Sequence, residues 1–188
     1  MLSSICSKPS QILIAFCFVL SLLVAGQTQA AVYLSSQEFV THSFDTNPKL
    51  NTIWLTPEMK GAAARFLGHP YQGIRLRYWQ VDQRTAWIIE EIGKERPITI
   101  GVVIDQGAIN RVEILEYRES RGGEVRHPFF TQQFAQLFLT EQETLSQGID
   151  GISGATLSVR AVTNVSRLAL YLHNVMAEPT NRTIRQPK

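Results

Sequence analysis

The spacing of the strand-like segments constrains the fold of this chain more than any other feature. Segments 85–93 ("TAWIIEEIG"), 97–105 ("PITIGVVID") and 108–119 ("AINRVEILEYRE") are rich in β-branched and aromatic residues. Only short connections separate them, and "DQGA" between the last two is a turn signal of hairpin length. Because parallel neighbours would need crossover helices, we predict that these strands form an antiparallel sheet.

Helices with clear boundary signals are predicted on both sides of these strands. The first is capped by Thr56, has Pro57 at its first position and ends at Gly68. The second begins near Thr156 and carries an apolar stripe at helical spacing. The stripe consists of Val159, Val162, Val165, Ala169, Leu172 and Met176. With an alternating strand at 74–79, the predicted fold class is α+β, an antiparallel sheet with helices packed against it.

Three further segments carry weaker signals. Residues 31–54 form a leading segment in which we expect one short helix. The paired glycines of 120–128 ("SRGGEVRHP") predict a flexible loop. Apolar residues at helical spacing predict a helix at 129–138 ("FFTQQFAQLF"). The polar stretch 177–188 contains two prolines and is predicted to be a disordered tail.

The N-terminus has the features of a signal peptide covering residues 1–30. Lys8 precedes an apolar run at 12–26, and small residues then allow cleavage after Ala30 or Ala31. As a helix the run would reach roughly 22 Å, short of the roughly 30 Å hydrocarbon core of a bilayer. We therefore expect a periplasmic or other extracytoplasmic protein, with an uncleaved N-terminal membrane anchor as the alternative.

Cysteine usage and charge exclude several classes of function. Cys6 and Cys17 both lie in the expected signal peptide, so the mature chain would contain no thiol for disulfides, zinc–thiolate sites or iron–sulfur clusters. The formal net charge is only +2, and basic residues are scattered, so nucleic-acid binding is not expected. The four histidines are isolated in sequence, and no Ser-His-Asp pattern is evident. Adjacent Glu90 and Glu91 should face opposite sides of a strand and suit solvent better than a catalytic pair.

The stretch "DGISGAT" at 150–156 stands directly before the last predicted helix. Gly151 and Gly154 permit backbone conformations that let several N–H groups converge, and the helix start adds a positive dipole end. Ser153 and Thr156 supply hydroxyls there. The stretch can therefore cap the helix or hold a phosphate. It is no Walker loop, because no lysine follows, and no dinucleotide fingerprint, because no βαβ strand leads into it.

The same stretch resembles the flavinylation motif of FMN-binding domains, D-x-x-S/T-G-A-T/S. The matching residues are Asp150, Ser153, Gly154, Ala155 and Thr156. Together with "RTAWIIEEIGKERPITIGVVID" and "EYRESRGGEVRHPFF", the motif makes residues 55–176 similar to the small exported, stand-alone branch of that family. The resemblance implies that a flavin transferase joins FMN through its phosphate to the hydroxyl of Thr156. It leaves three roles open for Asp150, namely a hydrogen bond to Ser153, support of the loop, or deprotonation of Thr156.

A second loop could complete the flavin site. In larger members of the family a loop "E-T-P-G" contributes to it, and Glu119, Ser120 and Gly122 of "ESRG" correspond, with Arg121 in place of the proline. Arg160 lies one turn after Thr156 and could either neutralise the phosphate or be a solvated side chain. Five aromatic residues could pack the flavin ring or belong to the core. They are Trp79, Trp87, Tyr117, Phe129 and Phe130.

These features predict an exported electron carrier with one covalent FMN, an electron-transfer module more than a stand-alone enzyme. Its expected partners are a flavin transferase for maturation and redox proteins or a membrane electron-transport complex. A periplasmic ligand-binding or adaptor module without covalent flavin is the alternative, and a flavin-dependent reductase of a small substrate is a third reading.

Overall fold

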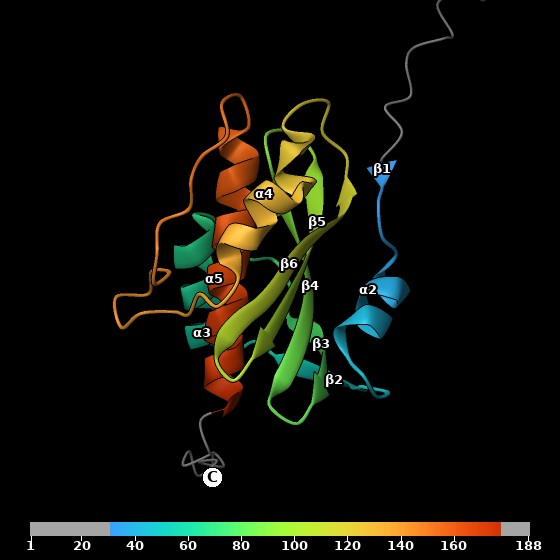
Figure 1. Ribbon diagram of the computed structural model, residues 1–188. Coiled ribbons are helices and arrows are strands. Elements are labelled where there is room, and N and C mark those ends of the chain that lie inside the picture. Colours follow the sequence, from blue (N-terminus) through green and yellow to red (C-terminus); the bar gives the residue numbers. More distant parts are fainter. Residues whose placement is uncertain (1–30, 178–188) are drawn as a thin grey trace, which may run out of the picture.

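The computed structural model describes residues 31–177, which contain a six-stranded antiparallel sheet in the order β1-β6-β5-β4-β3-β2 (Figure 1). Four of its strands follow one another as hairpins, so the predicted antiparallel arrangement and the α+β class are confirmed. The strands are β1 (Ala31–Val32), β2 (Lys49–Trp54), β3 (Arg75–Val81), β4 (Arg84–Ile92), β5 (Pro97–Asp105) and β6 (Ala108–Tyr117). The predicted signal peptide and polar tail lie outside the described residues, except Ala177, the last residue of α5 (Thr156–Ala177).

The hairpin turns alternate between the two ends of the sheet. The predicted β5–β6 turn contains Gln106 at φ 51° and Gly107 at φ 80°, left-handed conformations that suit a tight hairpin. The β3–β4 turn lies at the same end, and the β4–β5 turn at 93–96 lies at the other. This second end also receives the chain segment that follows β6, and it is the end where the candidate site forms.

The leading segment contributes more to the sheet than its sequence predicts. The expected short helix is present as α2 (Ser36–Ser43), and its start is fixed by a capping box between Ser35 and Glu38. The two edge strands, β1 and β2, had not been predicted. β2 is largely exposed, and its sequence lacks the regular apolar alternation of a half-buried strand.

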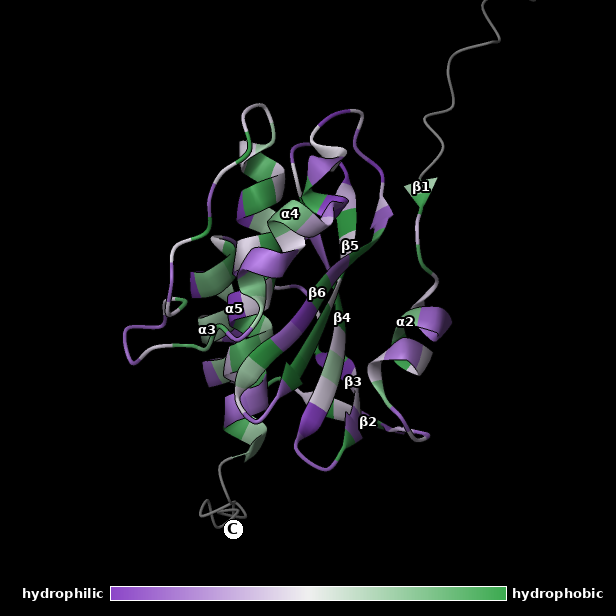
Figure 2. Ribbon diagram, viewed as in Figure 1, coloured by the Kyte–Doolittle hydropathy of each residue, from purple (hydrophilic) through white to green (hydrophobic). Residues whose placement is uncertain are grey.

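Three helices cover one face of the sheet and α2 covers part of the other (Figure 1). The covered face carries α3 (Pro57–Leu67), α4 (Pro128–Thr131) and α5 (Thr156–Ala177), and both long helices match their predictions. Thr56 caps α3 by accepting a hydrogen bond from the Met59 N–H, and Gly68 ends it at φ 81°. The apolar stripe of α5 faces the sheet, and Figure 2 shows the hydrophobic residues gathered on α5 and the central strands.

A small second core lies under α2. Phe39 is fully buried there, beside Val103 and Leu115. Gly101 of β5 leaves the space for the Phe39 ring, since a Cβ atom at this position would lie 2.6 Å from two of its ring carbons. The glycine thus lets α2 pack closely on the sheet.

Gly101→Ala is expected to lower the free energy of unfolding by about 1–3 kcal/mol, because the added methyl group overpacks this contact. Denaturant unfolding of the purified protein measures the change. Gly61→Ala on the exposed side of α3 is the control, because a Cβ there meets only an arginine side-chain tip at 4.0 Å. Equal stability of the Gly101→Ala variant and the wild type would contradict the expected packing.

The segment 120–138 departs from both predictions made for it. The expected flexible loop contains a 3-10 turn, η1 (Gly123–Arg126). The expected helix at 129–138 stops after α4 and a second 3-10 turn, η2 (Gln132–Phe134). It stops because Gln136 (φ 65°) and Leu137 instead bond through their backbones to Ile109 of β6. The apolar spacing here reflects burial against a strand and not a continuous helix.

Candidate functional site

A cleft of about 460 Å³ lies at the start of α5. Three separate stretches form it, namely the β4–β5 turn, the segment after β6 and the first turn of α5. Its lining residues are Lys94, Glu95, Glu119, Ser120, Arg121, Gly154, Ala155, Thr156, Leu157 and Ser158. We call it the Thr156 cleft. It brings together five of the eight residues predicted for the site: Glu119, Ser120, Gly154, Ala155 and Thr156.

Thr156 is the first residue of α5, and its side chain is exposed to the cleft. The preceding turn is closed by a hydrogen bond from the Ala155 N–H to the Ile152 carbonyl, at 3.0 Å. Ala155 is buried and anchors the turn, whereas Gly154 adopts φ 81° with open space around its Cβ position. A glycine is favoured at that backbone angle. The local sequence therefore presents the Thr156 hydroxyl at a helix N-terminus, where an anion is favoured.

Glu119 holds the opposite wall in place. One carboxylate oxygen, Oε1, accepts hydrogen bonds from the backbone N–H groups of Lys94, Glu95 and Arg96 at 2.5, 2.6 and 2.9 Å. Burial alone would raise the pKa of Glu119, but the three amide hydrogen bonds outweigh it and lower this pKa. Glu119 therefore stays ionised and fixes the β4–β5 turn against the segment that follows β6.

Gly122 packs the same segment onto α5. Its φ is 86°, and a Cβ atom there would lie 2.8 Å from the Tyr117 hydroxyl and 2.9 Å from Ser158 Oγ. These two hydroxyls are 2.9 Å apart, and Tyr117 also donates a hydrogen bond to the Arg121 carbonyl at 2.5 Å. Gly122 thus lies behind the cleft wall, where it permits close contact, and it does not line the cleft itself.

Asp150 and Ser153 are exposed and do not line the Thr156 cleft. The Asp150 backbone N–H donates to Gln133 Oε1 at 2.7 Å, which ties the motif to η2. Its carboxylate has no hydrogen bond to Ser153 among the contacts of residues 31–177, so the role of Asp150 remains a prediction. Arg160 is exposed on α5 and is likewise absent from the lining.

Sequence reasoning missed two groups that shape the cleft. Lys94 and Arg121 line it and supply positive charge opposite the helix start. Lys94 lies in a turn without a motif, and Arg121 stood out in the sequence only as the residue that replaces a proline in the "ESRG" loop. The Tyr117–Ser158 pair was also missed, because its two members come together only when β6 packs beside α5.

The aromatic residues considered for the flavin ring do not line the Thr156 cleft. Trp87 and Phe130 are fully buried, and Trp87 stacks on Tyr78 with ring centroids 4.8 Å apart. Phe129 is exposed on α4. For Trp87 and Phe130 the structure therefore supports the core reading.

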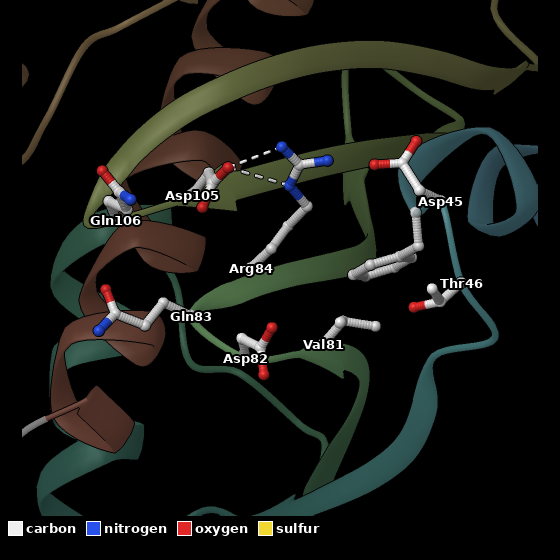
Figure 3. A pocket seen from close by; sticks show the side chains of 9 residues that line it. Asp45, Thr46, Val81, Asp82, Gln83, Arg84, Asp105 and Gln106 are labelled. Atoms are coloured by element: carbon white, nitrogen blue, oxygen red, sulfur yellow. Dashed lines mark hydrogen bonds and ion pairs between the residues drawn. The ribbon is translucent and has the colours of Figure 1, made fainter.

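A second pocket, of about 550 Å³, lies at the opposite end of the sheet (Figure 3). It is formed by the β3–β4 and β5–β6 turns and the end of α2. Arg84 Nε and Nη2 both donate to Asp105 Oδ2, at 3.0 and 2.7 Å, so this arginine is already paired. The pocket contains no residue of the predicted site.

Polar residues on β4 and its neighbours form ion pairs and no metal cluster within residues 31–177. Glu90 and Glu91 face opposite sides of β4 as predicted, yet Glu91 is buried and not solvated. It is paired with His69 at 2.8 Å between Nε2 and Oε1, and this hydrogen bond raises the pKa of His69. In the same part of the chain, no helix has the length and apolar character needed to span a bilayer.

An α+β domain with a cleft of this kind could bind a phosphate-containing ligand or a cofactor. A comparison with family models bears on which of these it binds. Residues 93–171 match the family model of the FMN-binding domain. This segment contains the whole Asp150-to-Thr156 motif and all of the residues that line the cleft. The resemblance seen in the sequence is thus confirmed over these residues. A search of curated proteins found no match.

A buried histidine at the other end of α5 makes stability depend on pH. His173 Nδ1 lies 2.8 Å from Thr85 Oγ1, which also accepts a hydrogen bond from Trp87 Nε1 at 3.0 Å. The threonine can then donate its own proton to an unprotonated Nδ1. Burial lowers the pKa of His173 from its ordinary value of 6.5, while the charge of Asp105 opposes this shift.

We expect the contribution of His173 to stability to be complete above pH 6.5 and to be lost as the pH falls below that value. Below it the unfolded chain binds a proton that the folded chain resists. Denaturant unfolding at several pH values, compared between the wild type and His173→Gln, isolates this contribution from that of His69. If acidification lowered the free energy of unfolding equally in the wild type and in His173→Gln, the expected contribution of His173 would be contradicted.

Proposed function

We propose that FMN is attached covalently to Thr156 and that the protein is an exported single-flavin electron carrier. The observation that carries the proposal is the exposed Thr156 hydroxyl at the start of α5, inside a cleft that Lys94 and Arg121 line together with Glu95 and Glu119. The helix N-terminus and Arg121 fit the single negative charge of the phosphodiester that this attachment would form, whereas Lys94 is already paired with Glu95 at 3.5 Å. When bound, the flavin supplies the electron chemistry and the protein supplies position and electrostatics.

The attachment is a phosphoryl transfer that a separate flavin transferase would catalyse. The Oγ1 atom of Thr156 attacks the flavin-side phosphorus of a flavin dinucleotide, and a new phosphorus–oxygen bond forms. The bond to the nucleoside monophosphate breaks, and this leaving group departs with the electron pair. The threonine proton passes to a base or to water, and no electron is gained or lost. Thr156 suits this step because it is exposed, so a second protein can reach it.

The intact mass of the protein, exported from a host with an active flavin transferase, tests this proposal. We expect an added mass of FMN less one water, yellow colour that survives denaturation, and an adduct on the peptide that contains 150–156. The same host should flavinylate a reference substrate of the transferase. An unmodified chain beside a modified reference would overturn the proposal.

A further inference from the structure

The most apolar cavity near the Thr156 cleft lies at the end of β4. It has a volume of about 670 Å³ and is larger than the cleft itself. Its apolar lining residues include Tyr71, Leu76, Ile88, Ile89, Ile92 and Pro97. We call it the apolar pocket. Ile92 is 57% exposed, so this apolar surface is open to a ligand.

The β4–β5 turn and its base contribute residues to both the apolar pocket and the Thr156 cleft. Lys94 and Glu95 line the cleft on one side of this turn. Ile92 and Pro97, which are paired across the base of the same turn, line the apolar pocket on the other. A ligand fixed at Thr156 could therefore reach the pocket across this turn.

The charged residues of the apolar pocket already have partners. Glu91 is paired with His69 at 2.8 Å, and Glu90 with Arg118 at 3.3 Å. Glu90 also accepts a hydrogen bond from Thr99. Both carboxylates are therefore engaged by side chains of the protein, and the apolar side chains dominate what a ligand would meet.

The pocket also offers backbone hydrogen-bonding groups along a strand edge. The β3–β4 register runs only from Tyr78↔Trp87 to Val81↔Arg84. Within residues 31–177, residues 88–92 of β4 therefore have a strand partner on the β5 side alone. An apolar cavity with a few backbone donors and acceptors is typical of a cofactor pocket.

On its other side the Thr156 cleft borders a smaller and more polar cavity, of about 310 Å³. We call it the Tyr33 pocket. It shares Glu119, Ser120 and Arg121 with the cleft, and Glu124, Arg126 and His127 also line it. The Tyr33 ring in it is covered by Arg126, whose guanidinium carbon lies 4.9 Å from the ring centroid. This side offers charge and little free apolar surface.

We propose that the apolar pocket binds the isoalloxazine ring of an FMN attached at Thr156. This placement rests on the function proposed above and adds the ring site to it. The phosphate and the polar ribityl chain stay in the Thr156 cleft, near Lys94 and Arg121. Ile92, Pro97 and Tyr71 would hold the ring, and the backbone groups of β4 that lack a β3 partner would bind its polar atoms.

Substitution of Ile92 tests the ring site in the flavinylated protein. Ile92→Asn makes the pocket polar without adding charge, and the exposure of Ile92 allows the fold to persist. Leu50→Asn is the matched control, because Leu50 is 50% exposed on the distant edge strand β2. Tyr33→Ala tests the polar side of the cleft. Intact mass, far-ultraviolet circular dichroism and thermal unfolding show that each protein is flavinylated and folded.

The readouts are the visible absorption maximum of the flavin and the quenching of its fluorescence by acrylamide, a neutral quencher. Ile92→Asn is expected to shift the absorption maximum and to raise quenching several-fold, while Leu50→Asn and Tyr33→Ala match the wild type. Flavinylated Ile92→Asn that behaves as the wild type would overturn the ring site alone. If Tyr33→Ala changed the absorption maximum and the quenching while Ile92→Asn did not, the ring site would also be overturned. Absence of the adduct from the wild type would overturn both proposals.

Discussion

Thr156→Val is expected to abolish the FMN adduct completely. Valine has nearly the shape of threonine but no hydroxyl, so the phosphoester has no acceptor oxygen. Because the Thr156 side chain is exposed, the loss of its hydroxyl should leave the fold intact. Intact mass spectrometry of wild type and variant, exported side by side with the transferase, gives the result directly.

Two controls make this result specific to Thr156. Thr156→Ser keeps a hydroxyl and should retain the adduct. Thr163→Val makes the same chemical change two turns later in α5, where the threonine hydroxyl donates to the Val159 carbonyl at 2.9 Å, and should also retain it. An adduct on Thr156→Val would show that FMN is attached elsewhere.

Gly122→Ala is expected to lower the free energy of unfolding by about 3 kcal/mol. Part of this cost, about 1–2 kcal/mol, comes from placing a side chain at φ 86°. The rest comes from the clash of the new methyl group with the hydroxyls of Tyr117 and Ser158. Because these groups join the cleft wall to α5, we also expect less flavinylation per folded molecule.

Gly107→Ala separates the two costs. Gly107 adopts a similar φ of 80°, but no atom lies within 4 Å of its Cβ position. This variant should lose only the conformational part, and its flavinylation should equal that of the wild type. Denaturant unfolding and intact mass measure both effects. An equal loss of stability in the two variants would mean that the packing of Gly122 is unimportant.

The central strands and the long helices could be predicted because their local signals agree with their environment. The residues of β4 to β6 are largely buried, so they carry strong β-forming composition. α3 carries a cap, a proline and a glycine at the positions where helices start and end. β2 could not be predicted in this way, because an exposed edge strand has no buried face to impose a pattern.

The candidate site was predicted only in its chemical centre. The Asp150-to-Thr156 motif is contiguous, so the sequence displays it directly. Lys94 and Arg121 come from separate turns, and only the sheet topology brings them opposite Thr156. For the same reason no local pattern predicted that Glu119 would accept hydrogen bonds from the backbone of residues 94–96.

The assembly of the cleft from the β4–β5 turn, the segment after β6 and the start of α5 has a consequence for the timing of maturation. The acceptor threonine and the wall opposite it are distant in sequence, and contacts of that kind are slow to form. An unfolded or incomplete chain would contain the acceptor motif but no cleft around it. A transferase that recognises the cleft would thus modify only chains that have finished folding, and the yellow colour of a preparation would report its folded fraction.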